Sequence, residues 1–315
     1  AFALPKKAQF QRTISIELRD PRGSFESNTA AWQALNQSIA LGFDAFSESS
    51  RMQENLWSRA ASFTAGLWTN AALRFYSHEA AHEIVYRGNN VDIRSRLDLQ
   101  NWKSSYIPGF YYPGWKQSQT NPILLTDEEL IVASVAGLVQ DELNTETVWR
   151  TSVARASISF YDAQSFLLTK IRDLEYITTS GSDEAPFAPG QPLHQLHQHV
   201  HSETPHLFDD VNLYRLALLN IGVEISNRQL LHRALFADLM SWHTWQSAWS
   251  LISYLTRGSH SAGMLTFRLG DNISILPPLF SHYMTMPGSF FNSSYILNIN
   301  NAQLQIDIGS MVGFS

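Results

Sequence analysis

The 315-residue chain is mildly acidic, with a formal net charge of −6 and a sequence pI of about 6.0. This balance, together with the lack of any cluster of lysine and arginine, argues against binding to nucleic acid. The chain has no cysteine, which excludes a disulfide framework, a thiol nucleophile and a cysteine-ligated metal. Only 16% of the residues are charged, against about 25% in a typical soluble protein, while 12% are aromatic. We therefore expect a secreted, periplasmic or outer-membrane-associated protein, and Ala1–Lys7 is typical of a processed mature end.

The first third of the chain contains one alternating segment and two long segments without internal helix breakers. Alternation of apolar and polar residues indicates a strand, whereas a long run free of proline, opened by a capping residue, indicates a helix. The pattern predicts, in order, a strand at Gln9–Leu18, a helix from Ser27 or Asn28 to about Phe46, a helix from about Met52 to Tyr86, and a short strand at Asn90–Leu99.

The second predicted helix carries the sequence H-E-A-A-H at His78–His82, close to its C-terminal end. Positions i and i+4 of a helix lie on one face, one turn apart, so the rings of His78 and His82 are expected side by side. Two imidazoles at this spacing can bind one Zn²⁺ ion, and the adjacent Glu79 can take a proton from metal-activated water. The sequence thus predicts a zinc site with Glu79 as its catalytic base.

The motif and its helix resemble those of the zincin-type metallopeptidases, over five residues and the surrounding helix. The resemblance implies a third protein ligand, with water in the fourth position. No histidine follows His82 until His194, so the metzincin continuation is absent. The gluzincin pattern takes a glutamate from a second helix instead. In the predicted helix Thr126–Leu143, the run of small residues that ends in an acid implies Glu142 as the third zinc ligand.

Two other carboxylates of this helix, Glu129 and Asp141, are alternatives for the third ligand. Thr126 and Glu129 have the spacing of a capping box, which gives Glu129 a structural reason to be there. The helix also carries a small-residue surface that allows another helix to approach closely. Its residues are Ala133, Ser134, Ala136 and Gly137.

The middle of the chain contains an aromatic segment and a histidine-rich tract. Tyr106–Trp115 is expected to be a loop, because proline and glycine recur in it. A helix at Thr145–Ile177 and a linker at Thr178–Pro192 follow. His194–His206 contains four closely spaced histidines and a fifth at its end, and such tracts can hold metal ions. We favour a flexible polar loop here, with a position near the zinc site as the alternative.

Two further helices are expected at Val211–Val223 and Asn227–Thr256. The part Leu239–Thr256 has no Asp, Glu, Lys or Arg but contains three tryptophans. A buried aromatic helix is the favoured interpretation, because the segment is short and polar for a membrane span. A helix lying in a membrane interface is the alternative.

The C-terminal region changes character, since Asn272–Ile306 contains no Asp, Glu, Lys or Arg. An exposed sheet edge without charges is an aggregation risk, so we expect a membrane or envelope partner to cover this region. Alternation and turn residues predict strands at Met264–Leu269, Ile273–Leu276, Ser289–Ile299 and Gln303–Val312, with a hairpin turn at Asn298–Ala302.

The sequence as a whole predicts an α+β protein with a mostly helical body and a C-terminal antiparallel sheet. We expect three parts: residues 1–177 with the zinc motif, a linker at 178–206, and a helical hairpin with the β region at 207–315. The predicted function is zinc-dependent hydrolysis of a peptide or protein substrate. The alternative is a non-catalytic subunit of the cell envelope in which the motif is vestigial or structural.

Overall fold

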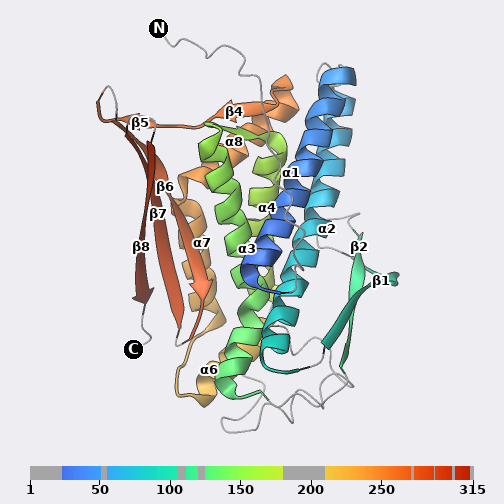
Figure 1. Ribbon diagram of the computed structural model, residues 1–315, viewed down its shortest axis with the longest axis vertical. Coiled ribbons are helices and arrows are strands. Elements are labelled where there is room, and N and C mark those ends of the chain that lie inside the picture. Colours follow the sequence, from blue (N-terminus) through green and yellow to red (C-terminus); the bar gives the residue numbers. More distant parts are fainter. Residues whose placement is uncertain are drawn as a thin grey trace.

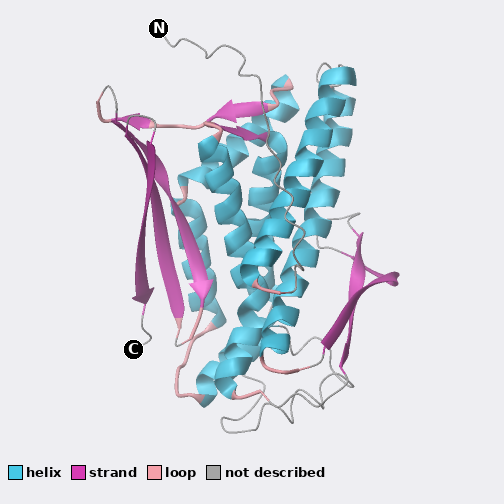
Figure 2. Cartoon of the chain, viewed as in Figure 1, coloured by secondary structure: helices cyan, strands magenta, loops and turns pink. Residues whose placement is uncertain are grey.

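The computed structural model describes residues 23–50, 55–91, 93–104, 111–119, 125–179, 210–270, 273–286, 288–299 and 302–312. It has a mostly helical body and a C-terminal antiparallel sheet, as the sequence predicts. The long helices lie side by side, with the sheet on one flank and a two-stranded hairpin on the other (Figures 1 and 2). The described elements are α1 (Phe25–Ser50), α2 (Leu56–Gly88), β1 (Ile93–Ser104), β2 (Tyr111–Gln119), α3 (Asp127–Ala154), β3 (Ser157–Ser159), α4 (Phe160–Thr179), α6 (Asp210–Asn220), α7 (Asn227–Met240), α8 (Trp242–Arg257), β4 (Ser261–Gly263), β5 (Phe267–Arg268), β6 (Ile273–Met284), β7 (Ser289–Ile299) and β8 (Ala302–Val312).

Side-chain caps fix where several helices begin. Asn55 accepts a hydrogen bond from the backbone N–H of Trp57 and starts α2. Thr126 and Glu129 form the predicted capping box at the start of α3, with both reciprocal hydrogen bonds present. Both caps satisfy backbone N–H groups that the first helical turn leaves without a partner. The first turn of α3 also carries three acidic residues, which interact favourably with the positive end of the helix dipole.

Helix α3 extends beyond the predicted break near Leu143 and ends only at Ala154. Asn144 does not terminate it, because its side chain is bound inside the bundle: it donates to Ser77 Oγ of α2 at 3.0 Å and accepts from Gln140, one turn earlier on α3, at 3.0 Å. The chain turns instead at Ala156, which has a positive φ of 52°. The predicted helix Thr145–Ile177 is therefore wrong at its start, since α4 begins at Phe160.

The predicted helix Asn227–Thr256 is divided into α7 and α8 at Ser241. Ser241 has an extended backbone conformation, and its hydroxyl oxygen accepts a hydrogen bond from the backbone N–H of Phe280 at 2.8 Å. That contact ties the junction of the two helices to β6. A bond to a distant strand thus decides the break, and no helix breaker marks it in the sequence.

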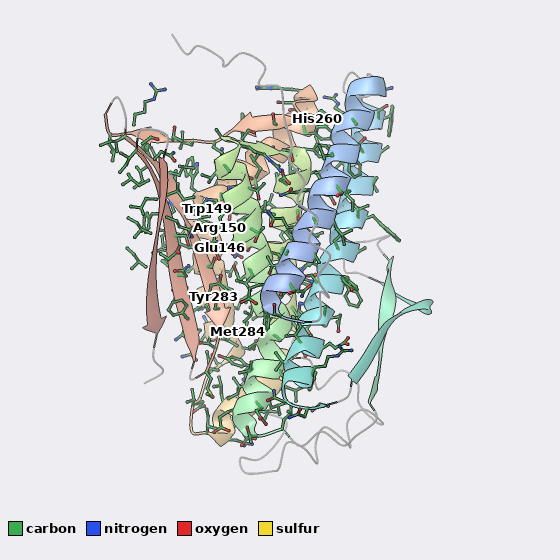
Figure 3. The ribbon with its side chains drawn as sticks, in the orientation of Figure 1. Glu146, Trp149, Arg150, His260, Tyr283 and Met284 are labelled. Carbon is green, nitrogen blue, oxygen red and sulfur yellow. The ribbon has the colours of Figure 1, made fainter. Side chains whose placement is uncertain are left out.

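The C-terminal sheet has the strand order β5-β6-β7-β8, and all its pairs are antiparallel. Strand β7 has the predicted bounds, and β6 is longer than predicted. One face of the sheet packs on α3: Tyr283 of β6 donates a hydrogen bond to Glu146 at 3.4 Å, beside the Glu146–Arg150 ion pair (Figure 3). A buried cluster joins sheet and helices here, with Trp149, Phe166, Leu276, Leu279 and Ile296 among its members.

The hairpin β1–β2 corrects one expectation and confirms another. The predicted strand after α2 is present as β1 and is longer than expected. Tyr111–Trp115, expected in a loop, belongs to β2 and pairs with β1. The predicted strand Gln9–Leu18 and the tract His194–His206 lie outside the described residues.

Among the described residues, no helix is both long and apolar enough to cross a membrane.

Candidate metal centre

The centre lies between α2 and α3, which pack against each other in antiparallel orientation. Arg74, His78 and His82 form one stripe on α2, at spacings of four residues. Ala133, Gly137 and Asp141 form the matching stripe on α3. The stripes meet in pairs: Arg74 with Asp141, His78 with Gly137, and His82 with Ala133.

Small residues on α3 allow this close approach, as the sequence predicted. A Cβ atom added at Gly137 would lie 2.3 Å from Nε2 of His78, so even alanine does not fit beside the ring. Ala133 is fully buried and presents its backbone carbonyl to the second histidine. The α3 backbone therefore forms one wall of the centre.

Both motif histidines are buried, and their Nδ1 atoms are held by hydrogen bonds. His78 Nδ1 lies 2.7 Å from Asp141 Oδ2, and His82 Nδ1 lies 2.7 Å from the carbonyl oxygen of Ala133. Both partners are acceptors, so both Nδ1 atoms carry the proton. In the neutral imidazoles this leaves the lone pair on Nε2, which is the tautomer that a metal ligand requires.

The third member of the group is Asp210, at the first position of α6. Its Oδ2 lies 3.2 Å from Nε2 of His82 and 3.8 Å from Nε2 of His78. One ligand atom from each of these residues lies within 4.8 Å of the others, which is close enough to share one ion. His82 Nε2 is buried and makes no aligned hydrogen bond within the described structure. A buried nitrogen of this kind is satisfied either by a proton directed at Asp210 or by a metal ion.

A second layer of contacts orients the three residues. Tyr176 of α4 donates its hydroxyl to Asp210 Oδ2 at 2.7 Å, and its ring lies edge-on to His78 at 5.8 Å between centroids. Arg74 bridges Asp141 Oδ2 at 2.6 Å and Asp173 Oδ1 at 2.8 Å. Each of the three residues is thus held by a partner on a helix other than its own, which is the support that metal ligands need.

Opposite charges set the protonation of the group. Burial alone would lower the pKa of His78, but the carboxylates of Asp141 and Asp210 outweigh it and raise that pKa to about 10. The pKa of His82 is also raised, against the effect of burial, by Asp210. Burial would raise the pKa of Asp210, yet the two histidines hold it well below its usual range. The site therefore attracts cations, and a metal ion competes with protons for the two Nε2 atoms.

Glu142, the predicted third ligand, lies elsewhere. Its carboxylate is bound to Lys170 Nζ at 2.6 and 2.7 Å, and Asp238 faces the same ammonium at 3.2 Å. Glu129 is occupied in the cap of α3. Asp141, the other alternative, binds Nδ1 of His78, on the opposite side of the ring from Nε2. The assignment of Glu142 is corrected: Asp210 accompanies the histidines.

Glu79 is half-buried and follows His78 on α2. Burial lowers the pKa of His82 and Asp210 raises it, and the negative charge of Glu79 adds to that rise. The pKa of Tyr86 is raised by burial, then by Asp210 and Glu79. The two motif histidines lie side by side as predicted, with 5.1 Å between their ring centroids. Asp210 was missed, and the available signal was an acidic pair, Asp209-Asp210, in front of a predicted helix.

Comparison with known proteins gives no assignment: no family model, no curated protein and no solved structure matches this chain.

Proposed function

We propose that this protein is a zinc-dependent hydrolase that acts on peptide bonds, with His78, His82 and Asp210 as the metal ligands. The observation that carries the proposal is the arrangement of the two histidines, whose Nδ1 atoms face acceptors on α3 while their Nε2 atoms lie beside one carboxylate. Two nitrogens and one oxygen, with a position left for water, are the ligand set of catalytic zinc sites.

The chain's own residues supply the remaining functions. When bound, Zn²⁺ provides Lewis acidity, which activates water and polarises the scissile carbonyl. Glu79 accepts the proton of the attacking water and later delivers it to the leaving amine. Asp141 and Tyr176 hold His78 and Asp210 in place, so little reorganisation is required during the reaction.

The test begins with metal content. Elemental analysis of the purified protein is expected to give one zinc per chain, and His78→Ala is expected to lose it. Two histidines and one carboxylate also suit non-haem iron, so the element itself is informative. Stoichiometric iron in place of zinc would contradict the hydrolase proposal.

The catalytic role is tested separately with Glu79→Gln. The amide cannot accept a proton, so this variant should keep its zinc and lose cleavage of a fluorogenic peptide mixture by about 10²–10⁴-fold. If wild-type protein loaded with zinc cleaves no peptide in the mixture, the non-catalytic envelope subunit becomes the better interpretation. If Glu79→Gln cleaves as well as wild type, another residue is the base.

A further inference from the structure

Helix α8 buries its polar side chains and exposes its large apolar ones, which is the reverse of a normal surface helix. A surface helix normally turns its apolar stripe to the core and its polar stripe to water. Here the buried side is polar and includes His243, Gln246, Ser247, Ser250 and Ser253. The large apolar side chains Trp242, Trp245, Trp249 and Ile252 are 43–55% exposed, and their spacing places them on one face.

The exposed apolar surface continues across the break into α7. Phe236, Leu239 and Met240 are each more than half exposed at the end of that helix. The indole N–H of Trp245 donates to the carbonyl oxygen of Leu239 at 2.9 Å, which ties the two helices together at this surface. We call the seven residues the tryptophan face. They are Phe236, Leu239, Met240, Trp242, Trp245, Trp249 and Ile252.

The exposed charged residues on α7 and α8 themselves are arginines, although the exposed Glu224 lies just before α7. Between Ile225 and His260 the only carboxylate is that of Asp238, which is buried and faces Lys170 at 3.2 Å. Arg228 at the start of α7 and Arg257 at the end of α8 are exposed. The guanidinium of Arg257 lies 5.9 Å from the ring centroid of Trp249, in cation–π range. In a chain of net charge −6, this face is an exception.

From this arrangement we propose that the tryptophan face docks on the surface of a lipid bilayer that contains anionic phospholipid. Tryptophan suits the membrane interface, because its ring is apolar and its N–H is polar. An apolar centre between two cations matches acyl chains below a layer of phosphate headgroups. A second copy is disfavoured, because pairing the same face would bring two sets of arginines together. This proposal goes beyond the hydrolase and does not depend on its metal.

The experiment measures co-sedimentation of the purified full chain with vesicles of phosphatidylcholine, with and without phosphatidylglycerol. Wild-type protein should bind both, and more tightly when phosphatidylglycerol is present. Tryptophan emission should shift to shorter wavelength on binding. The double variant Trp245→Ser/Trp249→Ser should bind at least about tenfold more weakly, since two large side chains no longer insert. Arg257→Gln should weaken binding to the anionic vesicles by about fivefold.

Ile308→Ser is the matched control, because Ile308 is 57% exposed on β8, outside the tryptophan face. It should bind vesicles as wild type does. All the changed side chains are exposed, and circular dichroism with thermal unfolding confirms that each variant is folded. The proposal is overturned if wild type does not bind vesicles, or if the double variant binds as wild type does. It is also overturned if light scattering shows an oligomer that the double variant dissolves, which would assign the face to a second copy.

Discussion

At the scale of single residues, similar carboxylates have different roles because they face different partners. Asp210 and Glu142 are both largely buried acids, yet one lies beside two histidine Nε2 atoms and the other is bound to an ammonium. Burial raises the pKa of Glu142, and Lys170 opposes that effect. A carboxylate already paired with Lys170 is not available to a metal ion, whereas Asp210 is.

Substituting each acid by its amide separates these roles. Asp210→Asn should lower zinc affinity by at least about 10–100-fold, because the ligand charge is lost. Glu142→Gln should retain zinc and lower the free energy of unfolding by about 1–3 kcal/mol, because Lys170 then keeps only Asp238 as a charged partner. Zinc titration with a competing chelator, together with urea unfolding, measures both quantities. If Glu142→Gln loses zinc and Asp210→Asn retains it, the assignment of the third ligand is wrong.

At the scale of elements, the centre depends on how closely α2 and α3 approach. The α2 motif supplies both histidines, and the α3 stripe supplies the space and the two Nδ1 acceptors. The sequence predicted the motif, the capping box and the small-residue surface, because each is a local pattern with a fixed helical period. It did not predict which α3 carboxylate faces the motif, since that depends on helix rotation.

Gly137→Ala tests this contact. The added methyl group would lie 2.3 Å from His78 Nε2, so the ring must move and zinc affinity should fall by about 10–100-fold. Gly42→Ala on α1 is the control, because nothing lies within 4 Å of the added atom. There the change should stabilise the fold by about 0.5–1 kcal/mol through helix propensity and leave zinc affinity unchanged. Equal zinc affinity in both variants would show that the close approach does not matter for the site.

At the scale of the whole molecule, the helical body carries much of its charge inside. Arg74, Asp141, Glu142, Lys170 and Asp173 are all buried between helices, whereas several tryptophans are exposed. With only 16% charged residues in the chain, burying some of them makes the surface poorer still in charge. The expectation of a buried aromatic helix at Leu239–Thr256 is therefore wrong for its tryptophans, which face outward.

Two buried histidines make stability depend on pH. Burial lowers the pKa of His243 and of His282 to about 3. An unfolded histidine titrates near about 6.5, so between these values the unfolded chain binds protons that the folded chain does not. The free energy of unfolding should thus fall as pH falls below about 6.5, by about 1.4 kcal/mol per pH unit for each histidine.

His243→Gln isolates one of these contributions. The ring of His243 contacts Phe166 at 4.5 Å between centroids, and neither nitrogen has a hydrogen-bond partner within the described residues. Glutamine does not titrate, so the slope of unfolding free energy against pH, between about pH 6 and pH 4, should decrease by about 1.4 kcal/mol per unit. Urea unfolding at several pH values gives this slope. An unchanged slope would mean that His243 already gains its proton in the folded protein.

The sequence by itself determined what short-range periodicity can determine. It predicted the side-by-side placement of His78 and His82 and the capping of α3, because these depend on residues within about one turn of each other. It also predicted the helical body and the C-terminal strands, because each element shows its own periodicity. The tertiary structure alone decided which acid lies beside the two histidines, the partners of the two Nδ1 atoms, the break at Ser241 and the outward side of α8. These depend on which elements meet in space, and no local pattern encodes how helices distant in sequence rotate against one another.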